Sequence, residues 1–345
     1  MVQQAAAQVL SLGYDKYFSE HSYGFRPGRS CQQAIEEALV YLNEGYEWVI
    51  DLDIEKYFDT VNHDKLILIL RERINDAKTL RLVRQFLQAG VMENGLVSPS
   101  KEGVPQGGPL SPILSNVYLD KLDQELEARG LHFVRYADDC NIFVKSEMAA
   151  DRVMKSVTSW LERKLRLKVS ATKTKVVRPT KSKFLGFTYL KMNGEWKCKP
   201  CNQSKMKLYD KCRRELVRRI GIARPMSITF RRINQIVVGW INYYRIGMMK
   251  IFIDTFGQWL RHKIRVIILK QWKIPKRIYI NLQKLNKKLP CHFTDEQIFS
   301  VANSRLGLYR QACGHVVNFL LSPRILAIKK KDRPGLVNPL NYYLS

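Results

Sequence analysis

The alternation of apolar and polar residues predicts a small sheet in the first half of the chain. Four short stretches rich in apolar and β-branched residues predict strands, at residues 48–53, 133–137, 141–144 and 184–189. The second and third stretches flank Asp138 and Asp139, so they predict a β-hairpin with two acids at its tip. The first stretch ends in a further acid, Asp53.

Helical spacing dominates the rest of the chain. In the first half it predicts helices over Cys31–Leu42, Leu66–Arg73, Leu80–Ala89, Ile113–Ala128 and Ala149–Leu165, the first of them with Ser30 as N-cap. Beyond residue 200 it predicts Lys205–Ile220, Ile228–Tyr244 and Phe252–Trp272. The apolar stripe of the second of these is expected to be bundle core: Ile233, Ile236, Val237, Trp240, Ile241 and Tyr244. The expected fold class is α+β, an antiparallel sheet with packed helices, followed by an all-α domain.

Charge separates the two halves of the chain. The 345 residues carry a formal net charge of +27. Residues 1–180 hold 24 Lys and Arg against 24 Asp and Glu, whereas residues 181–345 hold 34 against 7. A surplus this one-sided predicts a polyanionic partner, with nucleic acid favoured over an anionic membrane surface. No apolar run reaches the ~18 residues of a membrane span and the N-terminus lacks a basic signal, so we expect no membrane partner and a cytoplasmic location.

Seven cysteines without regular spacing argue against a disulfide framework. Cys198 and Cys201 form a CxxC pair, which Cys212 and the neighbours Cys291 and His292 could complete only through the fold. Unrelated thiols are the favoured interpretation, and a zinc site is the alternative.

The acids are placed as nucleotidyl transfer requires. That reaction uses two divalent metals about 3.5–4 Å apart, and Mg²⁺ prefers carboxylate and phosphate oxygens. A strand that ends in Asp53, beside a hairpin tipped by Asp138 and Asp139, aims three carboxylates at one point. An acidic pair alone would be an ordinary solvated turn, so the surrounding motifs decide the interpretation.

Several motifs resemble those of reverse transcriptases, in the same order. Tyr136–Asp139 resembles their YADD box, Asp53–Asp59 their first aspartate motif, Val104–Pro112 their PQG loop and Phe184–Phe187 their primer-grip strand. Two further segments, Ser22–Ser30 (SYGFRPGRS) and Gly239–Arg245 (GWINYYR), are similar to segments of bacterial group II intron reverse transcriptase/maturases. The resemblance covers nearly the whole chain.

The resemblance implies a role for individual residues. Asp53, Asp138 and Asp139 would hold two Mg²⁺ ions, with Mn²⁺ as a substitute, and the Ile54 carbonyl would assist one of them. Asp51 would be a supporting charge behind Asp53, on the same face of its strand.

Other residues would contact the substrates, by the same resemblance. Phe58 would exclude a ribose 2′-hydroxyl, with ordinary core as its alternative. Gln106 would touch template or nascent pair, and Gly107 would let the backbone approach closely. Lys173, with Lys175 as the competing choice, would lie near the incoming phosphate. The arginines of the SYGFRPGRS segment, Arg26 and Arg29, would contact template or guide phosphates, with a solvated loop as the alternative.

The resemblance further implies a right-hand polymerase. Partial fingers are expected at 1–47, the palm at 48–200, and a helical thumb and maturase domain at 201–345. In the family a further finger region lies upstream, and this chain resembles the part that follows it. No HNH endonuclease is expected, because the paired CxxC set of such a domain is missing from the C-terminal residues.

The expected function is RNA-directed DNA synthesis for a group II intron, combined with assistance to its splicing. The expected partners are group II intron RNA, an RNA template, a DNA primer or target, and dNTPs. One alternative is an RNA-binding splicing cofactor, or a truncated remnant with little polymerase activity. Another is a retron or defence-system reverse transcriptase, which the GWINYYR segment and the basic C-terminal half disfavour.

Overall fold

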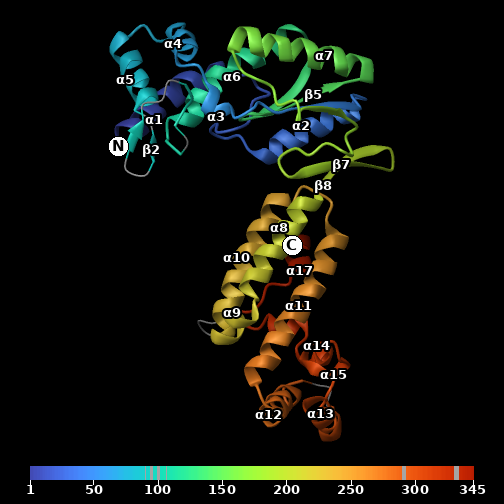
Figure 1. The fold of residues 1–345 in the computed structure, drawn as a ribbon. Helices are drawn as coiled ribbons and strands as arrows, with labels where there is room; N and C mark the ends of the chain where they lie inside the picture. The colour runs from blue at the N-terminus through green and yellow to red at the C-terminus, as the bar shows by residue number, and fades with distance from the viewer. Residues whose placement is uncertain (90, 94–95, 99–101, 106, 290–292, 330–333) are drawn as a thin grey trace. The chain divides into compact units, whose positions relative to one another are not determined.

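The computed structural model describes residues 1–345 except 90, 94–95, 99–101, 106, 290–292 and 330–333. The chain divides into two compact units, Met1–Cys198 and Lys199–Ser345 (Figure 1). The first unit mixes helices with antiparallel sheets and the second is helical, which confirms the expected fold class. The assignment of 1–47 to partial fingers stays a prediction. Among the described helices, none combines the length and the apolar character needed to cross a membrane.

A four-stranded antiparallel sheet lies at the centre of the first unit. Its strand order is β4 (His132–Tyr136), β5 (Asp139–Val144), β1 (Trp48–Leu52) and β6 (Lys175–Val177). The hairpin expected around the acidic pair is therefore β4–β5, and the strand before Asp53 lies directly beside it.

The two faces of β1 have different surroundings. Ile50 and Leu52 belong to the large core that also takes in residues of α6 (Ser111–Ala128) and α7 (Glu147–Trp160). The opposite face carries Val49, Asp51 and Asp53, because successive side chains of a strand alternate. That face is closed by α2 (Cys31–Asn43) at the end away from Asp53, where the Tyr41 ring lies 5.6 Å from the Phe143 ring.

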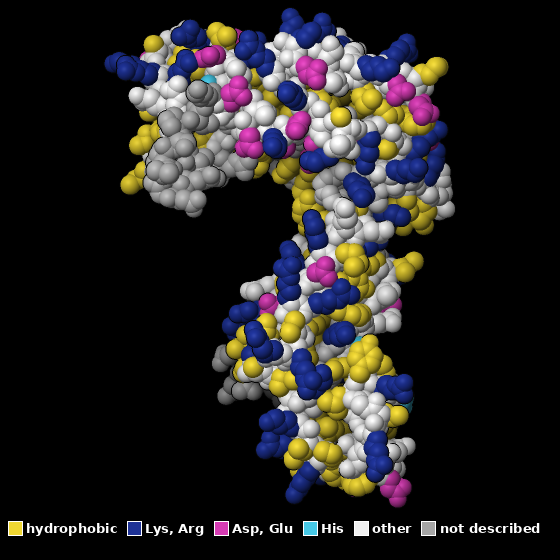
Figure 2. All heavy atoms as spheres, viewed as in Figure 1, with side chains coloured by type: hydrophobic (Ala, Val, Ile, Leu, Met, Phe, Trp, Pro, Cys, Tyr) yellow, Lys and Arg dark blue, Asp and Glu magenta, His cyan; other side chains and the backbone are white. Residues whose placement is uncertain are grey.

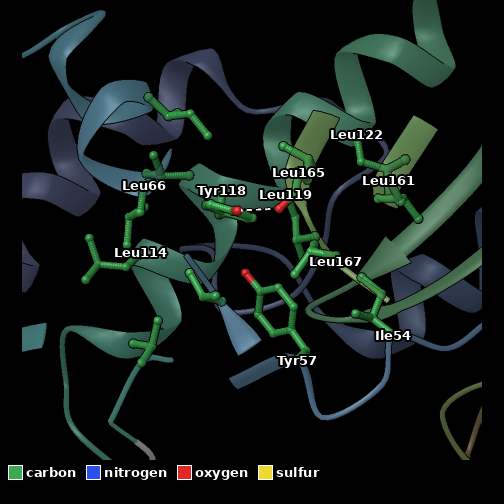
Figure 3. Close-up of a cluster of buried hydrophobic side chains, with 14 of the residues drawn as sticks. Ile54, Tyr57, Leu66, Leu114, Tyr118, Leu119, Leu122, Leu161, Leu165 and Leu167 are labelled. Atoms are coloured by element: carbon green, nitrogen blue, oxygen red, sulfur yellow. Dashed lines mark hydrogen bonds between the residues drawn. The ribbon is translucent and has the colours of Figure 1, made fainter. Parts of the chain in front are cut away.

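Two buried tyrosines, Tyr57 and Tyr118, form hydrogen bonds within the core of the first unit (Figure 3). The Tyr57 hydroxyl donates to the Ser115 carbonyl at 3.1 Å, and the Tyr118 hydroxyl donates to the Leu165 carbonyl at 2.6 Å. Each bond gives a buried phenol a hydrogen-bond partner. Tyr57 follows β1, Tyr118 is on α6 and Leu165 ends a short π-helical turn (Leu161–Leu165), so the core ties these elements together.

The remaining elements of the first unit surround this centre. They are α1 (Val2–Tyr14), a 3₁₀ turn (Asp15–Tyr17), α3 (Tyr57–Thr60), α4 (His63–Arg71), α5 (Ala77–Gln88), and the hairpins β2 (Val91–Glu93) with β3 (Leu96–Ser98) and β7 (Phe187–Met192) with β8 (Glu195–Pro200). Ser30 caps α2 as expected, in a reciprocal bond with Gln33.

The expected strand at 184–189 is wrong in its first half. Phe184 and Phe187 exchange two backbone hydrogen bonds, of 3.1 and 2.8 Å, across a two-residue turn. Leu185 and Gly186 both have positive φ, at 50° and 81°, as in a type I′ turn. The two phenylalanines are buried, so their apolar pattern imitates a strand although β7 begins only at Phe187.

The second unit is built from ten helices in its described residues: α8 (Asn202–Glu215), α9 (Arg218–Ala223), α10 (Met226–Tyr244), α11 (Lys250–Trp272), α12 (Pro275–Asn286), α13 (Asp295–Ala302), α14 (Gly307–Gln311), α15 (His315–Leu320), α16 (Pro323–Leu326) and α17 (Pro339–Leu344). The expected helix Lys205–Ile220 is interrupted, because the backbone is extended at Val217. In α10 the stripe is buried at Ile233, Val237 and Ile241, whereas Ile236 and Trp240 are half-exposed.

Candidate active site

The sheet register brings the expected carboxylates to one edge. Leu52 of β1 lies opposite Cys140 of β5, so the next residues in each direction, Asp53 and Asp139, end the two strands side by side. Paired residues of an antiparallel ladder point to the same face, which is the face not occupied by the α6–α7 core. Asp138 lies in the β4–β5 turn, where Ala137 adopts φ 58°, and so completes the acidic edge.

The backbone of Asp53 is fixed by the segment that precedes β6. The Asp53 amide donates to Thr174 Oγ1 at 3.1 Å, and the Asp53 carbonyl accepts from the Ser170 amide at 2.9 Å and from Thr174 Oγ1 at 3.2 Å. Ile54 forms a bridge with Val169 just beyond. These bonds hold the strand end, so the Asp53 carboxylate projects from a rigid position.

Both candidate lysines reach the acidic edge, at different carboxylates. Lys173 Nζ lies 3.3 Å from Asp53 Oδ1, and Lys175 Nζ lies 3.8 Å from Asp51 Oδ2. Lys173 is 69% exposed and can leave Asp53 at little cost, since such surface pairs contribute about 0–1 kcal/mol. The structure thus places Lys173 beside the expected metal ligand and Lys175 beside the supporting charge, while the phosphate contact of either stays a prediction.

The acidic edge concentrates negative charge. The pKa of Asp139 is raised to about 6, first by desolvation and then by the charges of Asp138, Asp53 and Asp51. Asp139 is exposed, so we give the desolvation of its carboxylate less weight than the repulsion from the neighbouring carboxylates. Burial also raises the pKa of Asp51, whose carboxylate accepts a 2.6 Å hydrogen bond from Ser182 Oγ.

The donor chemistry of this edge fits a hard divalent cation, which would relieve the repulsion. Reverse transcriptases in general depend on divalent metals. In the described ranges, however, no three His, Cys, Asp or Glu side chains stand in an arrangement that could hold a metal ion. Asp53, Asp138 and Asp139 are therefore neighbours at this edge rather than a preformed cage, and their role as metal ligands stays a prediction.

A buried ion pair supports the hairpin tip, and sequence reasoning missed it. Arg135 and Asp123 are completely buried, with Arg135 Nε and Nη2 donating to the two Asp123 oxygens at 2.7 and 2.5 Å. Arg135 Nη1 donates to the Ala137 carbonyl at 2.9 Å and to Asn116 Oδ1 at 3.2 Å. The guanidinium therefore links α6 directly to the turn that carries Asp138. Its only signal in the sequence is a charged residue within an otherwise apolar strand.

The SYGFRPGRS segment docks on the same hairpin. The Tyr23 amide donates to the Arg135 carbonyl and the Arg135 amide to the His21 carbonyl, both at 2.9 Å, and Arg135 Nη2 donates to Ser22 Oγ at 2.8 Å. A Cβ on Gly24 would overlap the backbone of Ala137, so only glycine permits this approach. The segment therefore pairs with the edge of β4 and stabilises the hairpin there.

The two arginines of this segment differ in their surroundings. Arg26 is 5% exposed, and its guanidinium makes four hydrogen bonds, two to Asp15 and one each to the Ser19 and Ser22 carbonyls. These bonds give Arg26 a structural role, and its expected phosphate contact stays a prediction. Arg29 pairs with Glu20 near the surface, where 24% of its side chain is exposed, and its phosphate contact stays a prediction.

Phe58 lies on α3, half-buried against the core, within the Asp53–Asp59 motif. The loop that leads to the PQG segment is fastened to the same helix, because the Val104 amide donates to the Phe58 carbonyl at 2.6 Å. A Cβ on Gly103, where φ is 90°, would come within 2.8 Å of that carbonyl, so this contact requires glycine. Gly107 also has positive φ, at 86°, and Gln106 lies outside the described residues.

The candidate zinc cysteines are separate buried thiols in the described part of the chain. Burial raises the pKa of Cys198 to about 11 and that of Cys212 to about 12. Cys201 is also buried, and its sulfur lies 3.3 Å from Ser204 Oγ. Cys291 and His292 lie outside the described residues.

The fold and the acidic edge together define a polymerase palm, and comparison with known families agrees. Residues 1–189 match the family described as reverse transcriptase (RNA-dependent DNA polymerase), and residues 205–285 match the maturase-specific domain of group II introns. The first match covers more than half of the chain, which therefore belongs to the reverse transcriptase family. The resemblance to group II intron reverse transcriptase/maturases is confirmed.

Individual relatives agree with this membership. Protein YkfC of Escherichia coli K12 is 33% identical over 214 residues, covering 51% of this chain and 56% of YkfC. The group II intron-encoded protein LtrA of Lactococcus lactis is 38% identical over 124 residues, covering 36% of this chain and 20% of LtrA. The matched regions thus span from about a fifth to about half of these relatives. Apo telomerase from Candida tropicalis is similar with a TM-score of 0.46 and 13% identity over 92% of this chain and 56% of that one, too weak a likeness to support an argument.

Proposed function

We propose that this chain is the RNA-directed DNA polymerase of a group II intron, which copies intron RNA into DNA from a DNA primer and dNTPs. The observation that carries the proposal is the side-by-side placement of Asp53 and Asp139, next to Asp138, at one edge of the palm sheet. Two bound Mg²⁺ ions, with Mn²⁺ as a substitute, would supply activation of the primer 3′-hydroxyl and stabilisation of the leaving pyrophosphate.

The protein's own residues would bind and orient the reactants. Asp53, Asp138 and Asp139, with the Ile54 carbonyl, would hold the ions. Lys173, which is exposed beside Asp53, would turn toward an incoming phosphate. Phe58 sits on the helix that follows Asp53 and would close the space next to the sugar 2′ position. Gln106 and Gly107 would face the template and nascent pair.

Primer extension tests this proposal. The 345-residue chain is incubated with an RNA template, an annealed DNA primer, dNTPs and Mg²⁺. We expect extension that EDTA abolishes and that added Mg²⁺ or Mn²⁺ restores. Absence of any extension with either metal, in a preparation that still binds the primer–template, would contradict the polymerase assignment.

We further infer a role in splicing of the intron RNA. The supporting observation is the match of residues 205–285 to the maturase-specific domain, within a unit that holds 30 Lys and Arg against 6 Asp and Glu. The same match favours a group II intron protein over a retron or defence-system reverse transcriptase. The DNA that flanks the coding region should encode a group II intron, and the chain should accelerate splicing of that RNA. No acceleration by chain that binds the RNA would restrict the proposal to DNA synthesis.

A further inference from the structure

A cavity of about 380 Å³ lies within the second unit, between α8 and α10. Lys207, Leu208 and Lys211 of α8 line one side, and residues from Gln235 to Tyr244 of α10 line the other. Its volume is in the range of small-molecule sites. Neither the family match nor the palm chemistry assigns it a ligand.

One wall of the cavity is aromatic and held in place. Trp240 Nε1 donates to the Ser204 carbonyl at 3.2 Å, and the Tyr244 hydroxyl donates to Ser204 Oγ at 2.8 Å. The Trp240 and Tyr244 rings lie 4.5 Å apart, and Tyr243 packs against Tyr244 at 4.7 Å. Since the polar atoms of Trp240 and Tyr244 are bonded to α8, their rings offer a preorganised apolar surface to a ligand.

The other wall carries positive charge. Lys207 and Lys211 are exposed and four residues apart on α8, so both lie on one face of that helix, at the rim of the cavity. The face of the second unit shown in Figure 2 carries many lysine and arginine side chains and few acidic ones. Aromatic rings beside a pair of lysines match a nucleotide, whose base is a flat π-system and whose phosphates are anions.

Gly239 lines the cavity and has open space beside it. A Cβ added at Gly239 would meet nothing within 4 Å, although this residue lies inside α10 and lines the cavity. Glycine in a helix interior is less favourable than alanine. No neighbouring atom requires glycine at position 239, so we attribute the glycine to a ligand that occupies this space.

We propose that this cavity receives one unstacked nucleotide of the bound RNA, with its base against Trp240 and Tyr243 and its flanking phosphates on Lys207 and Lys211. Proteins read RNA mainly through bases displaced from helices, such as those in bulges and loops. Gln235 at the cavity offers an amide that can pair with a base edge. This inference rests on the proposed function in that it presumes an RNA partner, and it adds the kind of RNA feature that is recognised.

The test compares two RNA hairpins on the full chain. One carries a single bulged 2-aminopurine nucleotide, and the other is fully paired. Binding is followed by anisotropy of an end label, and stacking by quenching of the 2-aminopurine. The parent should bind the bulged hairpin about tenfold more tightly than the paired one, the equivalent of stacking one base, and should quench the probe.

Substitutions then assign that preference to the cavity. Gly239→Leu fills the space with a good helix former and should bring the ratio of the two affinities near one. Lys207→Gln/Lys211→Gln should weaken the bulged hairpin more than the paired one. The matched control, Lys284→Gln/Lys288→Gln, removes two exposed lysines at the same spacing outside the cavity and should weaken both hairpins equally.

Two outcomes would overturn the inference. One is equal affinity of the parent for both hairpins, and the other is an unchanged preference in a folded Gly239→Leu variant. If the preference is absent while primer extension proceeds, the cavity takes another occupant, such as a peptide, and the polymerase proposal stands. If neither hairpin binds and no primer is extended, the proposed function itself fails.

Discussion

Removing the Arg135 side chain should both destabilise the first unit and misplace the hairpin that carries Asp138 and Asp139. Arg135→Met keeps an unbranched apolar side chain but shortens it and deletes every guanidinium donor. Asp123 then remains fully buried with its charge uncompensated, and the Ala137 carbonyl loses its 2.9 Å bond. Breaking a buried pair by removing one partner costs about 3–5 kcal/mol. We therefore expect a loss of that size in the free energy of unfolding.

A double variant separates stability from positioning. In Asp123→Leu/Arg135→Met the buried charge is removed with its partner, and apolar replacement of a buried pair is often neutral. Stability should return to within about 1 kcal/mol of the parent. Primer extension should stay low, because the guanidinium that ties the turn before Asp138 to α6 is then missing. Urea denaturation and primer extension on the same three proteins measure both effects.

A destabilisation below about 1 kcal/mol in Arg135→Met would show that Asp123 is relieved in another way, for example by protonation. Full recovery of primer extension together with stability in the double variant would show that Arg135 is structural only and does not position the hairpin.

Three further predictions follow from particular features. Burial, and after it the charge of Asp123, raises the pKa of Asp120 to about 6. Above that pH the ionised carboxylate lowers the free energy of unfolding by about 3 kcal/mol, and this loss disappears as the pH falls toward 4. Asp120→Asn should therefore raise the urea midpoint at pH 8 and change it little near pH 4, and equal shifts at both pH values would refute the assignment. Phe58→Ala should increase incorporation of rNTPs relative to dNTPs, measured by primer extension with each, whereas unchanged discrimination would return Phe58 to a core role. Affinity for structured RNA should fall about a thousandfold between 50 and 200 mM salt if six phosphates are contacted, and a flat response in filter binding would refute the electrostatic account.

The sequence predicted the acidic edge because that edge depends on local patterns. The strand before Asp53 and the hairpin around Asp138 are short, apolar and bounded by turn residues, so their type and pairing could be inferred. The motif order then linked these segments to a family with a known arrangement. The expected side-by-side placement of Asp53 and Asp139 appears in the sheet register.

What the sequence did not predict depends on contacts between distant segments. Arg135 and Asp123 are 12 residues apart, on β4 and α6. Neither the strand pattern around Arg135 nor the helix pattern around Asp123 indicated that the two side chains meet in the core. Arg26 looked like a surface cation in a glycine-rich loop, but the loop folds back on Asp15 and buries it. The turn at 185–186 was hidden because the buried phenylalanines on either side of it imitate a strand.

The central claim is that three carboxylates at one sheet edge carry out nucleotidyl transfer. Its most direct test is primer extension on an RNA template by Asp53→Asn, Asp138→Asn and Asp139→Asn, with Asp151→Asn on the exposed face of α7 as a matched control. Each of the three should lose extension by several orders of magnitude while binding the primer–template as tightly as the parent, and the control should retain full activity. Extension at the parent rate by any of the three would contradict the account.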